Sequence, residues 1–248
     1  IVDVNNEYGE FGIKTIALEH VPALMVHPRP EIRRLQPFKA GPKGAEKMTS
    51  AEISEMLEKL VSFYQGGALV VEDINKYMGD AMSQDLIGSI CTLRHNSCDM
   101  IMHYQSIGRP LPKIHQNTNM YRFHHQSDDV YKSEGKLEEL TEVCKIAQIL
   151  VDTQYYNNNK RFFVYINRDS GHIVGNFSMK MFDAALEEYI SETPKVLKRY
   201  TAKRDHNGKP VYTYPAAVLE FKKLAITKYW GNDAKITDDE REALFLVA

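Results

Sequence analysis

The feature that most constrains the fold is a helix signal followed at once by a strand signal. Thr49 and Glu52 match a capping box, and apolar residues then recur at helical spacing until Gly66 and Gly67 end the helix. The run Ala68–Val71 that follows is continuously apolar, which is typical of a strand buried on both faces. A helix followed directly by a buried strand predicts an α/β fold.

The same alternation continues along the chain. The pattern predicts helices over about Gln84–Arg94 and Leu137–Tyr155, and strands over Met100–Tyr104 and Met120–His124 with a proline-rich loop between them. Strands separated by helices imply parallel pairing with right-handed crossovers. A hairpin is expected to close the sheet with an antiparallel edge, from Arg161–Ile166 to His172–Val174.

Residues 1–47 contain no long periodic segment. Short extended pieces are expected at Ile1–Val4, Ala23–Val26 and Arg33–Phe38, because prolines interrupt this part of the chain. The stretch Lys39–Lys47 is expected to be a loop, and it contains the sequence Gly-Pro-Lys-Gly.

Composition narrows the function classes. The chain has 248 residues and a formal net charge of -2, with 31 Lys and Arg against 33 Asp and Glu, so any polyanion site must be local. Its three cysteines form neither a paired framework nor a metal site, which favours a reduced, cytoplasmic protein. No apolar run approaches the roughly 20 residues needed to span a bilayer, so no membrane segment is expected.

Candidate chemistry follows the strands. In a parallel α/β sheet, ligands bind beyond the carboxyl ends of the strands. Glu72 and Asp73 follow one strand, Gln105 follows the next, and Asp3 with Glu7 follows or ends the first. Two adjacent carboxylates at a buried strand end indicate a site for Mg²⁺ and phosphate. The alternative is that the pair only caps the turn at Asn75.

The order of these elements resembles a known family. A strand ending in acidic residues is followed by a helix, a strand ending in Gln105, the pair Arg109-Pro110, and an Asn before the strand in Asn117–Phe123. This arrangement resembles the additional-strand, catalytic-glutamate class of P-loop NTPases, and within it the FtsK/HerA family of DNA-pumping ATPases. Zot-type phage assembly proteins of the same superfamily are also similar around 92–105. The resemblance covers residues 1 to about 175.

The resemblance implies a role for each matched residue. Glu72 would hold Mg²⁺ through water, Asp73 would polarise the water that attacks ATP, and Gln105 would sense the γ-phosphate. Either Arg94 or Arg109 would be an arginine finger that reaches the nucleotide of a neighbouring subunit. The alternative for both arginines is a solvated helix end or loop.

Two departures from the family pattern are visible. The strand-end pair is Glu then Asp, whereas the family has Asp then Glu. The 248 residues contain no G-x-x-x-x-G-K-[ST] motif, which would bind the β- and γ-phosphates. Because the chain opens on Ile1 and a strand-like segment, we expect this motif in a segment upstream, and we expect the printed chain to bind ATP poorly.

Two regions are expected from these patterns. Residues 1–178 would form a three-layer P-loop NTPase-like core with a mostly parallel sheet, and residues 179–248 a helical C-terminal region that is basic at 195–230. The basic stretch has interleaved tyrosines, which indicates a surface that follows phosphates, or else a solvated helical face. Its candidate nucleic-acid contacts are Lys195, Lys198, Arg199, Lys203 and Arg204.

The function expected from the resemblance is ATP-driven translocation or packaging of double-stranded DNA. The active form would be a ring-shaped homo-oligomer, such as a hexamer, in a bacterium or encoded by a phage. One alternative is a degenerate P-loop scaffold or assembly protein that does not hydrolyse ATP. A third is a Mg²⁺-dependent nuclease using Asp3, Glu72 and Asp73, which would leave Gln105 without a role.

Overall fold

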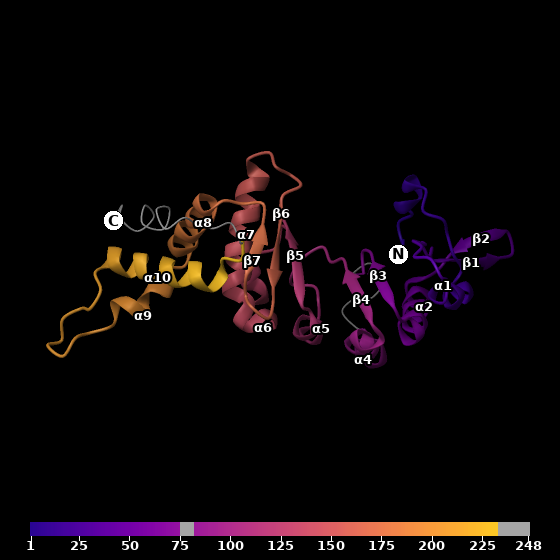
Figure 1. Ribbon diagram of the computed structural model, residues 1–248, viewed down its shortest axis with the longest axis horizontal. Coiled ribbons are helices and arrows are strands. Elements are labelled where there is room, and N and C mark those ends of the chain that lie inside the picture. The colour runs from indigo at the N-terminus through magenta and orange to yellow at the C-terminus, as the bar shows by residue number, and fades with distance from the viewer. Residues whose placement is uncertain (75–81, 233–248) are drawn as a thin grey trace. The chain divides into compact units, whose positions relative to one another are not determined.

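The computed structural model describes residues 1–74 and 82–232 of the chain (Figure 1). It divides into two compact units, Ile1–Asn117 and Thr118–Ala248, and each is described by itself. Both units mix helices with small sheets, so the chain is an α/β protein.

The first unit contains short helices, two pairs of strands and two longer helices. Its elements in chain order are the 3-10 helices η1 (Tyr8–Phe11) and η2 (Leu18–His20), helix α1 (Val21–Met25), strands β1 (Phe38–Gly41) and β2 (Gly44–Lys47), helix α2 (Ser50–Phe63), strand β3 (Gly67–Val71), helix α4 (Gln84–Thr92), the 3-10 helix η3 (Leu93–Asn96), strand β4 (Cys98–Met102) and helix α5 (Pro112–Asn117).

Helix α2 begins where the capping box predicts. The Thr49 side chain accepts a hydrogen bond from the Glu52 backbone N–H, and the Glu52 carboxylate accepts one from the Thr49 backbone N–H at 2.8 Å. These two bonds satisfy two of the backbone donors left open at a helix start. Gly66 and Gly67 then adopt positive φ and turn the chain into β3.

The central sheet of this unit is parallel. Strand β3 pairs with β4 in parallel, with Gly67 opposite Cys98 and Val71 opposite Met102. On the other side of β3, Val2 forms parallel bridges to both Val71 and Leu35. The expected strand at the chain start is therefore reduced to bridges, but it lies beside β3 as a parallel neighbour.

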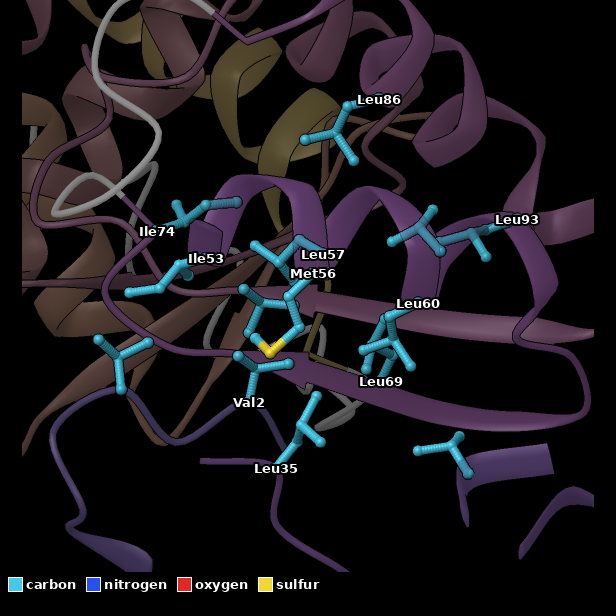
Figure 2. Packing of buried hydrophobic residues seen from close by; sticks show 14 of the residues in the cluster. Val2, Leu35, Ile53, Met56, Leu57, Leu60, Leu69, Ile74, Leu86 and Leu93 are labelled. Atoms are coloured by element: carbon cyan, nitrogen blue, oxygen red, sulfur yellow. The ribbon is translucent and has the colours of Figure 1, made fainter. Parts of the chain in front are cut away.

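One hydrophobic core joins α2 to this sheet (Figure 2). The apolar face of α2 lies on β3 and on the segment at Val2, and α4 and η3 add their own leucines. The residues labelled in Figure 2 are Val2, Leu35, Ile53, Met56, Leu57, Leu60, Leu69, Ile74, Leu86 and Leu93. This packing fixes the end of β3, and with it Glu72 and Asp73.

The second unit is built on an antiparallel sheet covered by helices. Its elements in chain order are strand β5 (Met120–His124), η4 (Val130–Ser133), α6 (Glu134–Leu137), η5 (Glu138–Leu140), helix α7 (Thr141–Tyr156), strands β6 (Phe163–Asn167) and β7 (Ile173–Gly175), helix α8 (Met179–Glu192), η6 (Pro194–Leu197), α9 (Lys198–Thr201) and α10 (Tyr214–Tyr229). Helix α7 packs on β5 and β6, and α8 packs on α7.

The hairpin of β6 and β7 is confirmed, but the pairing of β5 differs from the expected parallel arrangement. Strand β5 pairs antiparallel with β6, with Met120 opposite Asn167 and His124 opposite Phe163. Parallel strand pairs among the described residues therefore occur in the first unit. The helices from η4 to α7 connect β5 to β6 and return the chain to the end of the sheet where β5 finishes, with Phe163 opposite His124, so β6 runs antiparallel to β5. The three-layer arrangement and the division at residue 178 stay predictions.

Three local expectations in the first unit are wrong. Lys39–Lys47 is not a loop, because β1 and β2 pair antiparallel and Gly41 and Gly44 close the hairpin. Ala23–Val26 is not extended, because Pro22 stands at the start of the short helix α1, where proline is tolerated. In the same way, Pro112 begins helix α5 inside the expected proline-rich loop.

No helix in the described part of the chain is long and apolar enough to cross a membrane.

Candidate functional site

The carboxyl ends of β3 and β4 form one polar edge in the first unit. Strand pairing continues one step beyond the two strands, because the His103 N–H donates to the Val71 carbonyl at 2.9 Å and the Ile74 N–H donates to the His103 carbonyl at 3.3 Å. Glu72 and Asp73 therefore leave β3 beside the end of β4. This is the edge of a parallel sheet at which ligands bind.

The Glu72 carboxylate is positioned by a hydrogen bond from a tyrosine hydroxyl. The Tyr8 hydroxyl donates a hydrogen bond to Glu72 Oε1, and the Glu72 side chain is only 12% exposed. Burial, together with this bond to the carboxylate, raises the pKa of Tyr8 well above its ordinary value. The ring of His103 is mostly exposed, and its Nδ1 lies 3.7 Å from the same Glu72 oxygen.

The Asp73 carboxylate is positioned by a hydrogen bond from an asparagine side chain. Asn5 Nδ2 donates to Asp73 Oδ2 at 2.6 Å. The backbone of Asp73 has φ of 44°, in the left-handed region that Asp tolerates better than most residues. The strand thus ends in a sharp turn at Asp73, and the adjacent segment from the chain start holds its carboxylate.

Asp3 has a different environment. Its side chain is fully buried and lies 3.1 Å from Arg34 Nη1, and it also accepts hydrogen bonds from the backbone N–H groups of Glu7 and Tyr8. Arg34 further bonds the side chain of Asn6 and the Ile13 carbonyl. The Asp3 carboxylate is therefore neutralised by Arg34, and its hydrogen bonds stabilise the turn that carries Asn5 and Tyr8.

The remaining residues predicted for this site lie on the loop after β4. Gln105 is exposed and makes no hydrogen bond to Glu72 or Asp73 in the described part of the chain, and Ser106 beside it is buried. Arg109 is exposed on the same loop. Arg94 lies in η3, and its side chain and the position Asn75 fall outside the described residues. The catalytic roles given to these residues stay predictions.

The donors at this edge fit a metal that is held mainly by a nucleotide. Protein-bound Mg²⁺ takes one or two carboxylates, and waters and substrate phosphates complete its shell. Glu72 and Asp73 supply two carboxylates next to each other. Within residues 1–74 and 82–232, no group of three His, Cys, Asp or Glu side chains could hold a metal by itself.

The residues that hold the carboxylates were not among the predicted site residues. Asn5 and Tyr8 lie just after the expected extended piece Ile1–Val4, and no motif assigned them a role. His103 was read as part of a strand, whereas β4 ends at Met102 and His103 follows it. Alternation along β4 could have placed His103 across from Glu72, but no signal in the sequence pairs Tyr8 with Glu72.

The basic residues of the second unit separate into two groups. Arg199 and Lys203 line one pocket together with Lys228, which is not among the predicted nucleic-acid contacts. Lys195 lies 6.0 Å from the ring centroid of Tyr131, and the Arg204 guanidinium donates to the Thr201 carbonyl at 2.6 Å. Lys198 is exposed on α9.

Comparison with known proteins gives a distant structural likeness. No protein-family model and no curated protein sequence matches the chain. The genome packaging NTPase B204 from Sulfolobus turreted icosahedral virus 2, in complex with AMP, is similar with a TM-score of 0.43 and 12% identity over 70% of this chain and 77% of that chain. The same NTPase in complex with ATP-gammaS is similar with a TM-score of 0.43 and 11% identity over 68% and 74%. A TM-score below 0.5 establishes neither a shared fold nor a shared activity.

Proposed function

We propose that the first unit is the hydrolytic part of an ATP-driven motor of FtsK/HerA type that moves or packages double-stranded DNA. The observation that carries this proposal is the polar edge of the parallel sheet, where Glu72 and Asp73 are held by neutral side chains. The order of motifs around Gln105 and Arg109 supports the same family.

The geometry suggests how the chain's own residues would act. Asp73 stands on a turn beyond β3 with one oxygen bonded to Asn5, and its carboxylate would accept a proton from the attacking water. Glu72 would face Mg²⁺ through water, held by Tyr8. A bound Mg²⁺ would neutralise charge on the β- and γ-phosphates. Gln105, on the neighbouring strand end, would contact the γ-phosphate.

Hydrolysis in a ring would need a cation from a neighbouring subunit. Arg109 is exposed on the loop after β4, so its guanidinium is available to another copy of the chain. An arginine finger of this kind stabilises the charge of the transferring phosphoryl group and contributes about three to five decades in rate. We assign this role to Arg109 or Arg94, with ATP and Mg²⁺ as cofactors.

The nuclease alternative has less support than the motor. It requires Asp3, Glu72 and Asp73 to share a metal, but Asp3 is occupied by Arg34 and two backbone N–H groups. The scaffold alternative would have the same geometry as the motor but would not hydrolyse ATP. Only a measurement of ATP hydrolysis therefore separates the scaffold from the motor.

The test is steady-state ATP hydrolysis by the full-length gene product, with and without double-stranded DNA. We expect turnover that DNA stimulates and that Asp73→Asn lowers by at least about 100-fold, the size of a general-base contribution. Asp99→Asn is the matched control, because Asp99 is an exposed carboxylate on β4 in the same sheet. This control should hydrolyse ATP at the wild-type rate.

Three results would count against the motor. Equal rates for Asp73→Asn and the wild type would remove Asp73 from the chemistry. A folded full-length protein that binds ATP without hydrolysing it would favour the scaffold. DNA cleavage that depends on Mg²⁺ and is lost in Asp3→Asn would favour the nuclease.

A further inference from the structure

The second unit has an open pocket of about 470 Å³ formed largely by α9, α10 and the residues that follow α9. Both helices lie in the same unit and contact each other (Figure 1). Three cations line the pocket: Arg199 from α9, Lys203 just beyond it, and Lys228 near the end of α10. The pocket therefore collects positive charge from two segments that are 25 to 30 residues apart in the sequence.

Aromatic rings lie beneath these cations. The Arg199 guanidinium is 5.0 Å from the ring centroid of Tyr200, and the Lys228 ammonium is 4.7 Å from that of Tyr229. The Lys203 ammonium is 6.0 Å from the Tyr200 ring. Contacts of this length orient a cation over a ring without neutralising its charge. The three charges therefore remain available to an anion.

The charge balance of the pocket is positive. Glu142 is the one carboxylate in its lining, and it accepts a hydrogen bond from the Tyr229 hydroxyl. In the described part of the chain, Arg199, Lys203 and Lys228 form no ion pair. Elsewhere in this unit, cations such as Lys145 are paired with carboxylates. The pocket therefore brings three cations without ion pairs into one lining.

A buried hydroxyl in the wall is a second, independent sign of a ligand. Tyr200 is only 4% exposed, and its hydroxyl oxygen is buried with no hydrogen-bond partner among the described residues. A buried polar group without a partner costs free energy, so such groups in native proteins are nearly always satisfied by protein, water or a ligand. Tyr200 also lines the pocket, so a small shift of its side chain would let the hydroxyl donate to a bound anion.

We propose that this pocket binds a backbone phosphate of double-stranded DNA, with Arg199, Lys203 and Lys228 as charge partners and the Tyr200 hydroxyl as a donor. The proposal rests on the proposed DNA motor. Stacking of single-stranded bases needs exposed ring faces. The rings in the pocket wall are buried, with Phe221 at 1% exposed, which favours contact with the phosphate backbone over contact with bases.

The first test compares two triple variants of the full-length protein by fluorescence anisotropy with a labelled duplex at several salt concentrations. The pocket variant carries Arg199→Ala, Lys203→Ala and Lys228→Ala. The control carries Lys132→Ala, Lys160→Ala and Lys180→Ala, which remove the same charge from exposed positions of the same unit. Loss of one phosphate contact lowers the slope of log K against log salt by about one, so the pocket variant should lose about one and the control should keep the wild-type slope.

The second test is Tyr200→Phe, which removes the hydroxyl and leaves the charge unchanged. A hydrogen bond to a charged group predicts about a tenfold loss of duplex affinity at an unchanged salt slope. If the hydroxyl does not meet a phosphate, Tyr200→Phe binds as the wild type does, and its part in the proposal is overturned.

A measurement on the wild type guards against misfolded variants. Amine-reactive labelling read by mass spectrometry should show Lys203 and Lys228 protected by duplex DNA, and Lys132 and Lys180 equally reactive with and without it. Equal losses in the two triple variants, or no protection of the pocket lysines, would overturn the proposal. Protection by single-stranded DNA but not by duplex would do the same. None of these readouts requires ATP turnover, so failure of the motor is seen separately in the hydrolysis assay.

Discussion

The two units hold their buried charges in different ways. In the first unit, Glu72 and Asp73 receive hydrogen bonds from a phenol and an amide, both of which are neutral. In the second unit, Lys145 lies 3.2 Å from both Asp129 and Glu192, and its side chain is only 7% exposed. A carboxylate held by a neutral donor keeps its net charge, whereas a paired charge is already compensated.

This difference separates a site from a structural contact. Hydrogen bonds from Tyr8 and Asn5 position the strand-end carboxylates of the first unit at the sheet edge where ligands bind. Lys222 of the second unit follows the structural pattern, with Asp183 at 2.9 Å and Glu187 at 2.7 Å. Asp3 shows that the first unit also contains a structural pair, because Arg34 neutralises it.

The largest expected effect tests that structural pair. Asp3→Ala leaves Arg34 and two backbone donors without their buried partner, so we expect a loss of about 3–5 kcal/mol in the free energy of unfolding of the first unit. Urea unfolding followed by amide hydrogen exchange in α2 and β3 measures it. Asp99→Ala, an exposed carboxylate of β4, should stay within about 0.5 kcal/mol of the wild type.

The single tryptophan sharpens this comparison. Trp230 packs against Phe177 and Phe182 in the second unit, with ring centroids 5.4 and 5.6 Å apart. Its fluorescence therefore reports unfolding of that unit. If Asp3→Ala moves the tryptophan transition as far as the exchange of β3, the two units unfold together and the comparison between them fails.

A middle effect is expected in the second unit. Lys145→Met keeps most of the side-chain volume but leaves Asp129 and Glu192 without their cation. Both carboxylates are nearly half exposed, so solvent screening reduces the cost to about 1–3 kcal/mol. Trp230 fluorescence during urea unfolding measures it. The control is Lys180→Met at an exposed position of α8, and equal stability of the two variants would contradict the prediction.

The difference in unfolding free energy between the wild type and Lys145→Met should depend on pH. Burial opposes ionisation of Asp129, but the Tyr131 N–H and the Lys145 ammonium outweigh it, so the pKa of Asp129 is lowered. Burial also opposes the charge on Lys145, but its bonds to Glu192 and Asp129 outweigh it, so the pKa of Lys145 is raised. The gap between wild type and Lys145→Met should therefore shrink below about pH 4 and above about pH 10. A gap that grows in acid would contradict it.

The smallest effect tests the neutral partner of Glu72. Tyr8→Phe removes one hydrogen bond to a mostly buried carboxylate, so we expect about 1 kcal/mol of lost stability in the first unit. Hydrogen exchange of β3 amides measures it. Tyr156→Phe, at a residue 72% exposed, is the control and should change little. The ATP turnover of Tyr8→Phe is then compared with the turnover expected from its folded fraction. A larger loss of turnover would show that the Tyr8 hydroxyl positions Glu72 for ATP hydrolysis.

Local patterns in the sequence were sufficient for several elements. The capping box predicted the start of α2, and the run at Ala68–Val71 predicted β3, because each of these signals is contained in a few neighbouring residues. The hairpin of β6 and β7 was likewise predicted, since a short connection leaves antiparallel pairing as the only option. The polar edge after β3 was also predicted, because a charged pair directly after a buried strand must lie at its end.

Contacts between distant segments could not be predicted in this way. Nothing in the sequence of β5 distinguishes a parallel neighbour from the antiparallel partner β6 that it has. Asn5 and Asp73 are 68 residues apart, and Tyr8 and Glu72 are 64 apart. The pocket cations Arg199, Lys203 and Lys228 belong to two segments that meet only because α9 packs on α10.

The sequence by itself determined which residues carry charge at the end of β3 and where the main helices begin, because capping and hydrophobic periodicity act over neighbouring residues. The tertiary structure decided what each charge meets. Glu72 and Asp73 receive neutral donors, Asp3 receives Arg34, and three basic residues of the second unit receive no carboxylate within the described residues. That outcome depends on packing between segments far apart in the chain, which capping and hydrophobic periodicity do not specify.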